Sequence, residues 1–153
     1  MIDEEGAPGV IEFNVRFGDP ETQVTIPLIS SDMGQLLLAC AEGRISEEEY
    51  EFHDLCAATV VLASEGYPAS SSTGRKISGS EVKIEEGMTS AFVHYAGTII
   101  GEDGQLISSG GRVLSATGLA PSLNDAVAAS YELIECIQLE GSHYRSDIAY
   151  RAL

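Results

Sequence analysis

The sequence predicts an α+β fold in which a small, mostly antiparallel β-sheet packs against one long helix. The continuous apolar run over 56–63 has the length and the β-branched residues of a buried strand. Shorter strand-like runs follow at 91–96, 105–108 and 112–119, with glycine-containing turns between them. Ser122 then opens a segment whose apolar residues recur every three or four positions, as on one face of a helix. A group of strands followed by one long helix is typical of the α+β class.

The long helix has signals at its start and along one face. Ser122 is suited to the N-cap position, and Asp125 stands three residues later, as in a capping box. The apolar stripe consists of Leu123, Val127, Tyr131, Ile134 and Ile137. We therefore expect this face of the helix to pack on the sheet.

The first third of the chain has a different pattern, and we expect it to form a separate part. It predicts a strand at about 10–17, a short helix over 20–29 and a second helix that begins at Asp32. Asp19 precedes a proline and a glutamate, so it is predicted to cap the first of these helices. The composition changes after residue 54, where the continuous apolar run begins.

Composition and charge narrow the class of protein. The chain has 153 residues, enough for one domain or a little more. Its formal net charge is −16, which argues against a nucleic-acid partner because such partners need clustered cations. No apolar run is long enough to cross a membrane, and the acidic residues 3–5 are unlike a secretory or mitochondrial leader. We therefore expect a cytoplasmic protein that binds neither nucleic acid nor membrane.

Some side chains that are able to carry chemistry receive a structural interpretation instead. Cys40, Cys56 and Cys136 are widely spaced and form no metal-binding pair, so they are predicted to be buried free thiols. Arg75 and Lys76 lie in a polar loop and are predicted to be solvated.

A row of polar residues in the first strand points to a ligand site. Residues 11–17 alternate large apolar residues with Glu12, Asn14 and Arg16. Because successive side chains of a strand point to opposite faces, these three would share one face, spaced by about 7 Å. Carboxylate and amide oxygens suit a hard cation such as Mg²⁺, and a guanidinium can bind phosphoryl or carboxylate oxygens in a forked geometry. The row therefore predicts a site for a metal ion that carries phosphate.

Four blocks of the chain, in this order, resemble the phosphoribosylamine–glycine ligase family of the ATP-grasp superfamily. The blocks are residues 9–23, 60–68, 110–114 and 144–153. The resemblance covers almost the whole chain but only the C-terminal portion of the family's enzyme. It implies that residues 1–54 are the last strand and helices of an ATP-grasp domain, with the chain beginning inside a hairpin. It also implies that residues 55–153 are the family's C-terminal domain.

The resemblance implies a reaction and a partner. In this family ATP phosphorylates the carboxylate of glycine, and the amine of 5-phosphoribosylamine attacks the acyl phosphate. Glycinamide ribonucleotide, ADP and phosphate leave, which is a step of purine biosynthesis. The implied partner is the N-terminal remainder of the enzyme, which holds ATP. We therefore expect the isolated chain to be inactive.

The resemblance also implies roles for individual residues. Carried over by position, Glu12 and Asn14 are the ligands of Mg²⁺, with Mn²⁺ as an alternative metal. Arg16 is the catalytic residue that stabilises the acyl phosphate or the transferred phosphate. Asp19 either orients the substrate or only caps the helix, and we prefer the cap.

Two positions depart from the pattern of the family. Tyr95 stands between His94 and Ala96, where the family has the block Phe-His-Ala-Gly-Thr. An extra residue predicts a shifted register or a bulge, so we interpret His94 as a strand histidine with a satisfied hydrogen bond. Ala149 stands where the family often has glycine.

Two other functions stay open. The chain is alternatively a non-catalytic binding or assembly module that completes an ATP-grasp enzyme in trans. It is also compatible with another ATP-grasp ligase of the carboxylase type, which the Glu-x-Asn-x-Arg row permits but the C-terminal block does not favour.

Overall fold

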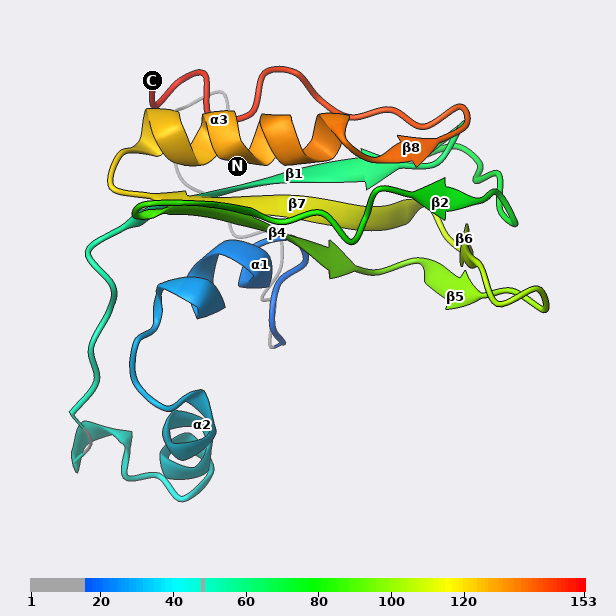
Figure 1. Ribbon diagram of the computed structural model, residues 1–153. Helices are drawn as coiled ribbons and strands as arrows, with labels where there is room; N and C mark the ends of the chain where they lie inside the picture. The colour runs from blue at the N-terminus through cyan, green and yellow to red at the C-terminus, as the bar shows by residue number, and fades with distance from the viewer. Residues whose placement is uncertain (1–15, 48) are drawn as a thin grey trace, which may run out of the picture.

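The computed structural model describes residues 16–47 and 49–153, and its centre is a four-stranded antiparallel sheet. The strands are β1 (Cys56–Ala63), β3 (Ile84–Glu86), β4 (Thr89–Tyr95) and β7 (Arg112–Ala120), and they pair in the order β1–β7–β4–β3. Helix α3 (Leu123–Glu135) lies across one face of this sheet, and the short helix α1 (Thr22–Thr25) lies near the other (Figure 1). The α+β architecture predicted from the sequence, with antiparallel sheets and a packing helix, is confirmed.

Two further strand pairs extend the domain beyond the central sheet. Strand β5 (Thr98–Ile100) pairs with β6 (Leu106–Ser108), and β2 (Ile77–Ser78) pairs with β8 (Gln138–Leu139). The sequence patterns missed β3, β5 and β8, each of which has only two or three residues.

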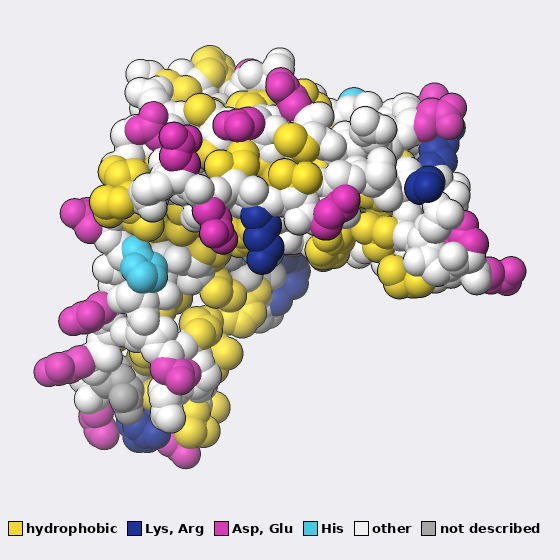
Figure 2. Space-filling model, in the orientation of Figure 1, with side chains coloured by type: hydrophobic (Ala, Val, Ile, Leu, Met, Phe, Trp, Pro, Cys, Tyr) yellow, Lys and Arg dark blue, Asp and Glu magenta, His cyan; other side chains and the backbone are white. Residues whose placement is uncertain are grey.

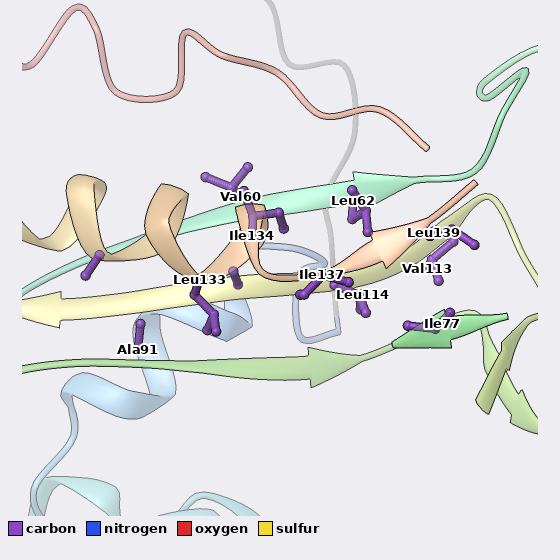
Figure 3. Close-up of a cluster of buried hydrophobic side chains, with 12 residues drawn as sticks. Val60, Leu62, Ile77, Ala91, Val113, Leu114, Leu133, Ile134, Ile137 and Leu139 are labelled. Carbon is purple, nitrogen blue, oxygen red and sulfur yellow. The ribbon is translucent and has the colours of Figure 1, made fainter. Parts of the chain in front are cut away.

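The core lies between α3 and the central sheet (Figure 3). Leu133 and Ile134 of the helix are fully buried against Val60 and Leu62 of β1 and Leu114 of β7. Burying such side chains contributes about 1.5–3 kcal/mol each, so this contact contributes substantially to the stability of the domain. The predicted stripe is confirmed at Val127 and Ile134, whereas Ile137 is buried beyond the helix end.

The start of α3 is capped as the sequence predicts. The Asp125 N–H donates to Ser122 Oγ at 3.1 Å, and the Ser122 hydroxyl donates to Asp125 Oδ2 at 2.6 Å. These bonds satisfy one of the free N–H groups of the first turn and place a carboxylate near the positive end of the helix.

The first third of the described chain carries short helices. They are α1, the 3-10 turn η1 (Ile26–Leu28), helix α2 (Met33–Ala41) and the 3-10 turn η2 (Ile45–Glu47). The predicted start of α2 is confirmed, since Asp32 Oδ1 accepts the Gln35 N–H at 3.0 Å. Helix α2 projects away from the sheet, and Ala39 is its only buried residue (Figure 1).

The predicted capping role of Asp19 is wrong. Helix α1 begins only at Thr22, and Glu21 occupies its N-cap position without a side-chain bond. The Asp19 carboxylate instead contacts Gln23 and an arginine of β7. The cap was predicted from sequence neighbours alone. In the structure the carboxylate pairs with a charged side chain from a strand that is distant in the sequence.

The shifted register or bulge predicted at Tyr95 is also wrong. Strand β4 pairs with β7 without interruption from Ser90, opposite Leu119, to Tyr95, opposite Leu114. The Tyr95 hydroxyl donates to Ser80 O at 3.0 Å, so the side chain is tied down beside the strand. A register shift occurs instead between Leu62 and Ala63 in β1.

Two structural interpretations of single side chains need correction. Cys40 and Cys136 are exposed and Cys56 is half-buried, so none is the buried thiol that was predicted. Arg75 is not simply solvated, because it pairs with the Glu65 carboxylate and donates to Glu140 O at 2.7 Å.

Among the helices in the described part of the chain, none combines the length and the apolar character that crossing a membrane requires.

Candidate functional site

The candidate site predicted from the sequence is only partly within the described residues. Glu12 and Asn14 lie outside them, while Arg16 and Asp19 lie inside. Arg16 is exposed, and its Nη1 donates to Phe17 O at 2.9 Å. Its guanidinium forms no ion pair with any residue of 16–47 or 49–153, which leaves it available to an anionic ligand.

Asp19 is joined to the domain by Arg112, the first residue of β7. Arg112 Nη2 lies 3.0 Å from Asp19 Oδ2, and Arg112 Nη1 donates to the Asp19 backbone oxygen at 3.0 Å. Asp19 Oδ1 accepts Gln23 Nε2 at 3.1 Å. The structure therefore brings together two residues that are 93 positions apart, and only Asp19 was predicted as a site residue.

A groove of about 430 Å³ runs between this segment and the end of β4, and most of its lining is apolar. Phe17, Ile26 and Pro27 supply apolar walls, while Gln23 and His94 bring polar groups to it. Phe17, which follows Arg16 in the sequence, lines the groove, whereas Arg16 itself does not.

His94 is held on the sheet face that looks toward α1 and η1. Its Nδ1 lies 3.1 Å from Thr117 Oγ1, which in turn is 2.7 Å from Thr59 Oγ1. Burial lowers the pKa of His94 below its ordinary value, because the charged imidazolium is less well solvated there. The interpretation of His94 as a strand histidine with a satisfied hydrogen bond is confirmed.

Two buried side-chain oxygens in the described part of the chain have no hydrogen-bond partner, namely Gln23 Oε1 and Ser115 Oγ. Ser115 is directly opposite His94 in the β4–β7 register, so the two side chains share one face of the sheet. Buried polar atoms of this kind are usually satisfied by ordered water. No sequence pattern marks either residue, because the signal is their burial and not their spacing.

The C-terminal residues form a second cationic feature. Arg145 and residues 147–152, which follow α3 in the chain, line an open hollow of about 650 Å³. Arg145 holds Asp147 by two bonds, at 2.9 and 2.8 Å, and this hydrogen bonding lowers the pKa of Asp147. Ala149 has a φ of 65°, in the left-handed region that glycine adopts more readily than other residues.

A metal-binding cluster is not visible in the described part of the chain, where no three His, Cys, Asp or Glu side chains come together. The two residues predicted as metal ligands are outside this part. Their chemistry can be judged from type alone: a carboxylate and an amide oxygen are both donors that Mg²⁺ accepts.

Comparison with known families matches most of the central sheet and α3 to one domain. Residues 57–151 match the family model described as phosphoribosylglycinamide synthetase, C domain.

Curated proteins extend the similarity to almost the whole chain. A phosphoribosylamine–glycine ligase of Mycobacterium tuberculosis is 47% identical over 146 residues, covering 95% of this chain and 33% of the relative. The enzyme of the same name from Salmonella typhimurium is 42% identical over 153 residues, covering all of this chain and 35% of the relative. The chain therefore spans about a third of the length of these relatives.

The structure is also similar to a solved one. A crystal structure of a phosphoribosylamine–glycine ligase from Thermotoga maritima aligns with a TM-score of 0.71 at 31% sequence identity. The alignment covers 96% of this chain and 34% of that protein.

Proposed function

Because the chain belongs to the phosphoribosylglycinamide synthetase C-domain family, we propose that it is the C-terminal part of a ligase that joins glycine to 5-phosphoribosylamine. The reaction would convert ATP to ADP and phosphate and serve purine biosynthesis in the cytoplasm. One observation carries the proposal: the chain is similar over nearly its full length to ligases of that name.

The proposed chemistry needs cationic groups where phosphate charge builds up. Glycine's carboxylate attacks the terminal phosphorus of ATP, and the bond to ADP breaks. The amine of 5-phosphoribosylamine then attacks the acyl carbonyl, and phosphate leaves. Arg16 is suited to hold phosphoryl oxygens in both steps, because a guanidinium offers paired donors and Arg16 has no described acidic partner.

Glu12 and Asn14 would hold Mg²⁺ beside Arg16 in this proposal, with Mn²⁺ as a substitute. A bound Mg²⁺ would neutralise negative charge on the nucleotide phosphates. An amide ligand next to a carboxylate adds an oxygen donor without a further negative charge, which suits a site that must also accept ATP. Asp19 then serves through its contacts with Gln23 and Arg112, and its proposed role is to shape the substrate side of the site.

The exposed apolar residues of the α2 region support a missing polypeptide partner. Leu37 and Leu38 are 46% and 48% exposed, and the following segment exposes Tyr50 and Phe52 by 55% and 61%. Figure 2 shows hydrophobic side chains on the surface of this projecting part. Exposed apolar groups gathered on one part of a protein usually mark a contact surface. We propose that residues 1–54 complete an ATP-grasp domain with the N-terminal remainder of the enzyme, while residues 55–153 form the C-terminal domain.

The alternative is a module that binds and completes an ATP-grasp enzyme in trans without chemistry of its own. The exposed apolar residues of the α2 region support binding of a polypeptide under both functions. The Glu-x-Asn-x-Arg row takes part in the reaction only if the chain is part of the ligase.

Reconstitution separates them. The chain is mixed with the remaining two-thirds of the M. tuberculosis relative, and glycinamide ribonucleotide is measured with ATP, glycine and 5-phosphoribosylamine. The proposal expects no turnover by either piece alone, turnover by the mixture, and loss of most turnover with Arg16→Ala. Turnover by the isolated chain contradicts the fragment proposal. An unchanged rate with Arg16→Ala supports the non-catalytic module.

A further inference from the structure

Arg112 is the side chain that ties the segment after Arg16 to the folded domain. Its two terminal nitrogens contact different parts of Asp19: Nη2 the carboxylate oxygen Oδ2, and Nη1 the backbone oxygen, each at 3.0 Å. A guanidinium that grips both the side chain and the backbone fixes the position and the orientation of a residue.

This contact has no substitute in the described structure. Between residues 16–28 and residues 56–153, Arg112 and Asp19 form the only hydrogen bonds and the only ion pair within the described part of the chain. The other contacts between these two parts are the packing of α1 and the 3-10 turn η1 against β1 and the walls of the groove. Packing of this kind is less directional than a hydrogen-bonded ion pair, so we expect the orientation of Asp19 to depend on Arg112.

The backbone of Arg112 is itself fixed on both sides. The Gly97 N–H donates to Arg112 O at 2.9 Å, and the Ser64 N–H donates to Gly111 O at 2.8 Å. A Cβ atom on Gly97 would lie 2.8 Å from Arg112 O, so the absence of a side chain at Gly97 permits this close approach. Hydrogen bonds from residues just after β1 and β4 therefore hold the backbone that carries the Arg112 side chain.

The Asp19 segment, residues 18–23, also has hydrogen bonds of its own. Gln23 Nε2 donates to Asp19 Oδ1 at 3.1 Å, and the Thr22 N–H donates to Gly18 O at 3.2 Å. Asp19 is thus linked to helix α1 by hydrogen bonds, and Arg16 stands only three residues before Asp19.

We propose that Arg112 is a positioning residue for Arg16. Through Asp19 it holds the described segment that begins at Arg16 at a fixed place on the C-terminal domain. This inference rests on the proposed ligase function. Arg112 touches no reacting atom, and its effect passes through the place of Arg16.

Arg75 provides a matched control. It also grips one carboxylate, that of Glu65, and one backbone oxygen, that of Glu140. Both of its partners lie within residues 56–153, so Arg75→Gln removes a similar pair of contacts without releasing the Asp19 segment.

The first test measures amide hydrogen exchange by NMR in the 153-residue chain. For Arg112→Gln we expect the amides of residues 22–25 to exchange at least about tenfold faster, while amides of β1 and β7 are unchanged. Arg75→Gln should leave residues 22–25 as they are. Unchanged exchange at residues 22–25 in Arg112→Gln contradicts the proposal.

The second test is kinetic and uses a hybrid in which this chain replaces the matching third of the M. tuberculosis ligase. For Arg112→Gln we expect kcat to fall about 10- to 100-fold, because a small displacement of a catalytic group has effects of this size. The KM for glycine should stay within about twofold, and Arg112→Lys should recover part of kcat.

A parental kcat in Arg112→Gln, or a change confined to KM, contradicts the positioning role. Arg75→Gln is expected to keep the parental kcat. If the unsubstituted hybrid forms no product, the proposed function has failed, and the exchange result alone then decides whether Arg112 holds the Asp19 segment.

Discussion

The hydroxyl of Ser130 in α3 accepts the backbone N–H of Gly118 in β7 at 2.9 Å. The same hydroxyl lies 2.9 Å from Ala58 O in β1 and 2.8 Å from Ala126 O in its own helix. Ser130 is fully buried, so one hydroxyl joins the helix to the backbone of two neighbouring strands. This contact links α3 to the sheet beside the buried apolar core.

Replacing Ser130 should destabilise the domain more than its size suggests. Ser130→Ala removes the contacts of a fully buried hydroxyl with Gly118 N–H, Ala58 O and Ala126 O, and losing these buried hydrogen bonds together costs about 1–3 kcal/mol. We expect a loss of this size in the free energy of unfolding, measured with urea. Ser146→Ala, at an exposed serine, is the control and should change the free energy by less than about 0.5 kcal/mol. Equal effects of the two substitutions would show that the buried hydroxyl has no special role.

Gly118 should not tolerate a side chain. A Cβ atom there would lie 2.2 Å from the Ala126 backbone oxygen and 3.0 Å from the Ser130 nitrogen, so α3 would have to move away from β7. We expect Gly118→Ala to lower the free energy of unfolding by about 1–3 kcal/mol or more. Thermal unfolding measures this. A midpoint equal to that of the unsubstituted chain would mean that the helix and the sheet separate without cost.

His94 should make stability depend on pH in a defined direction. Its folded pKa is lowered by burial, so the unfolded chain binds the proton more readily than the folded one. The contribution of neutral His94 is therefore complete above the unfolded pKa of about 6.5 and is lost as the pH falls through the lowered folded value. Urea unfolding between about pH 7.5 and 5 should show this loss in the natural chain and a smaller loss in His94→Gln. The exposed His53→Gln is the control, and identical pH dependence in His94→Gln and the natural chain would contradict the account.

The α2 region should matter for association and not for the stability of the domain. Leu37 and Leu38 are each about half exposed, and replacing both with serine removes apolar surface while leaving the core between α3 and the sheet intact. We expect the free energy of unfolding to change by about 1 kcal/mol or less. The Kd for the N-terminal remainder, measured by calorimetry, should rise at least about tenfold. Met88→Ser, at a methionine that is 67% exposed far from α2 in sequence, should leave Kd unchanged. If the leucine substitutions leave the Kd unchanged, α2 is not part of the contact surface, and the proposal for this region is contradicted.

The parts of the fold that the sequence predicted are those with strong local signals. The eight residues of β1 are apolar apart from Thr59, and the capping pair of Ser122 and Asp125 accompanies a regular apolar stripe. Strand β5, by contrast, has three residues and pairs only with β6, so it is too short to show a period of its own.

The candidate site was predictable in its residue types but not in its contacts. Arg16 and Asp19 stand out because the chain has few cations and the segment matches a family block. The bond from Arg112 to Asp19 could not be predicted, since the two lie 93 positions apart and Asp19 has a plausible local role as a helix cap. Local patterns predicted that Asp19 caps a helix. In the structure Asp19 instead pairs with Arg112, the first residue of β7.

The most direct measurement is product formation by the hybrid ligase in which this chain replaces the matching third of the M. tuberculosis enzyme. The hybrid and its parent are assayed with ATP, glycine and 5-phosphoribosylamine, and glycinamide ribonucleotide and ADP are quantified together. We expect the hybrid to form both products in equal amounts and Arg16→Ala to abolish most of this turnover. A folded hybrid that binds ATP as its parent does, yet forms no glycinamide ribonucleotide, would contradict the account.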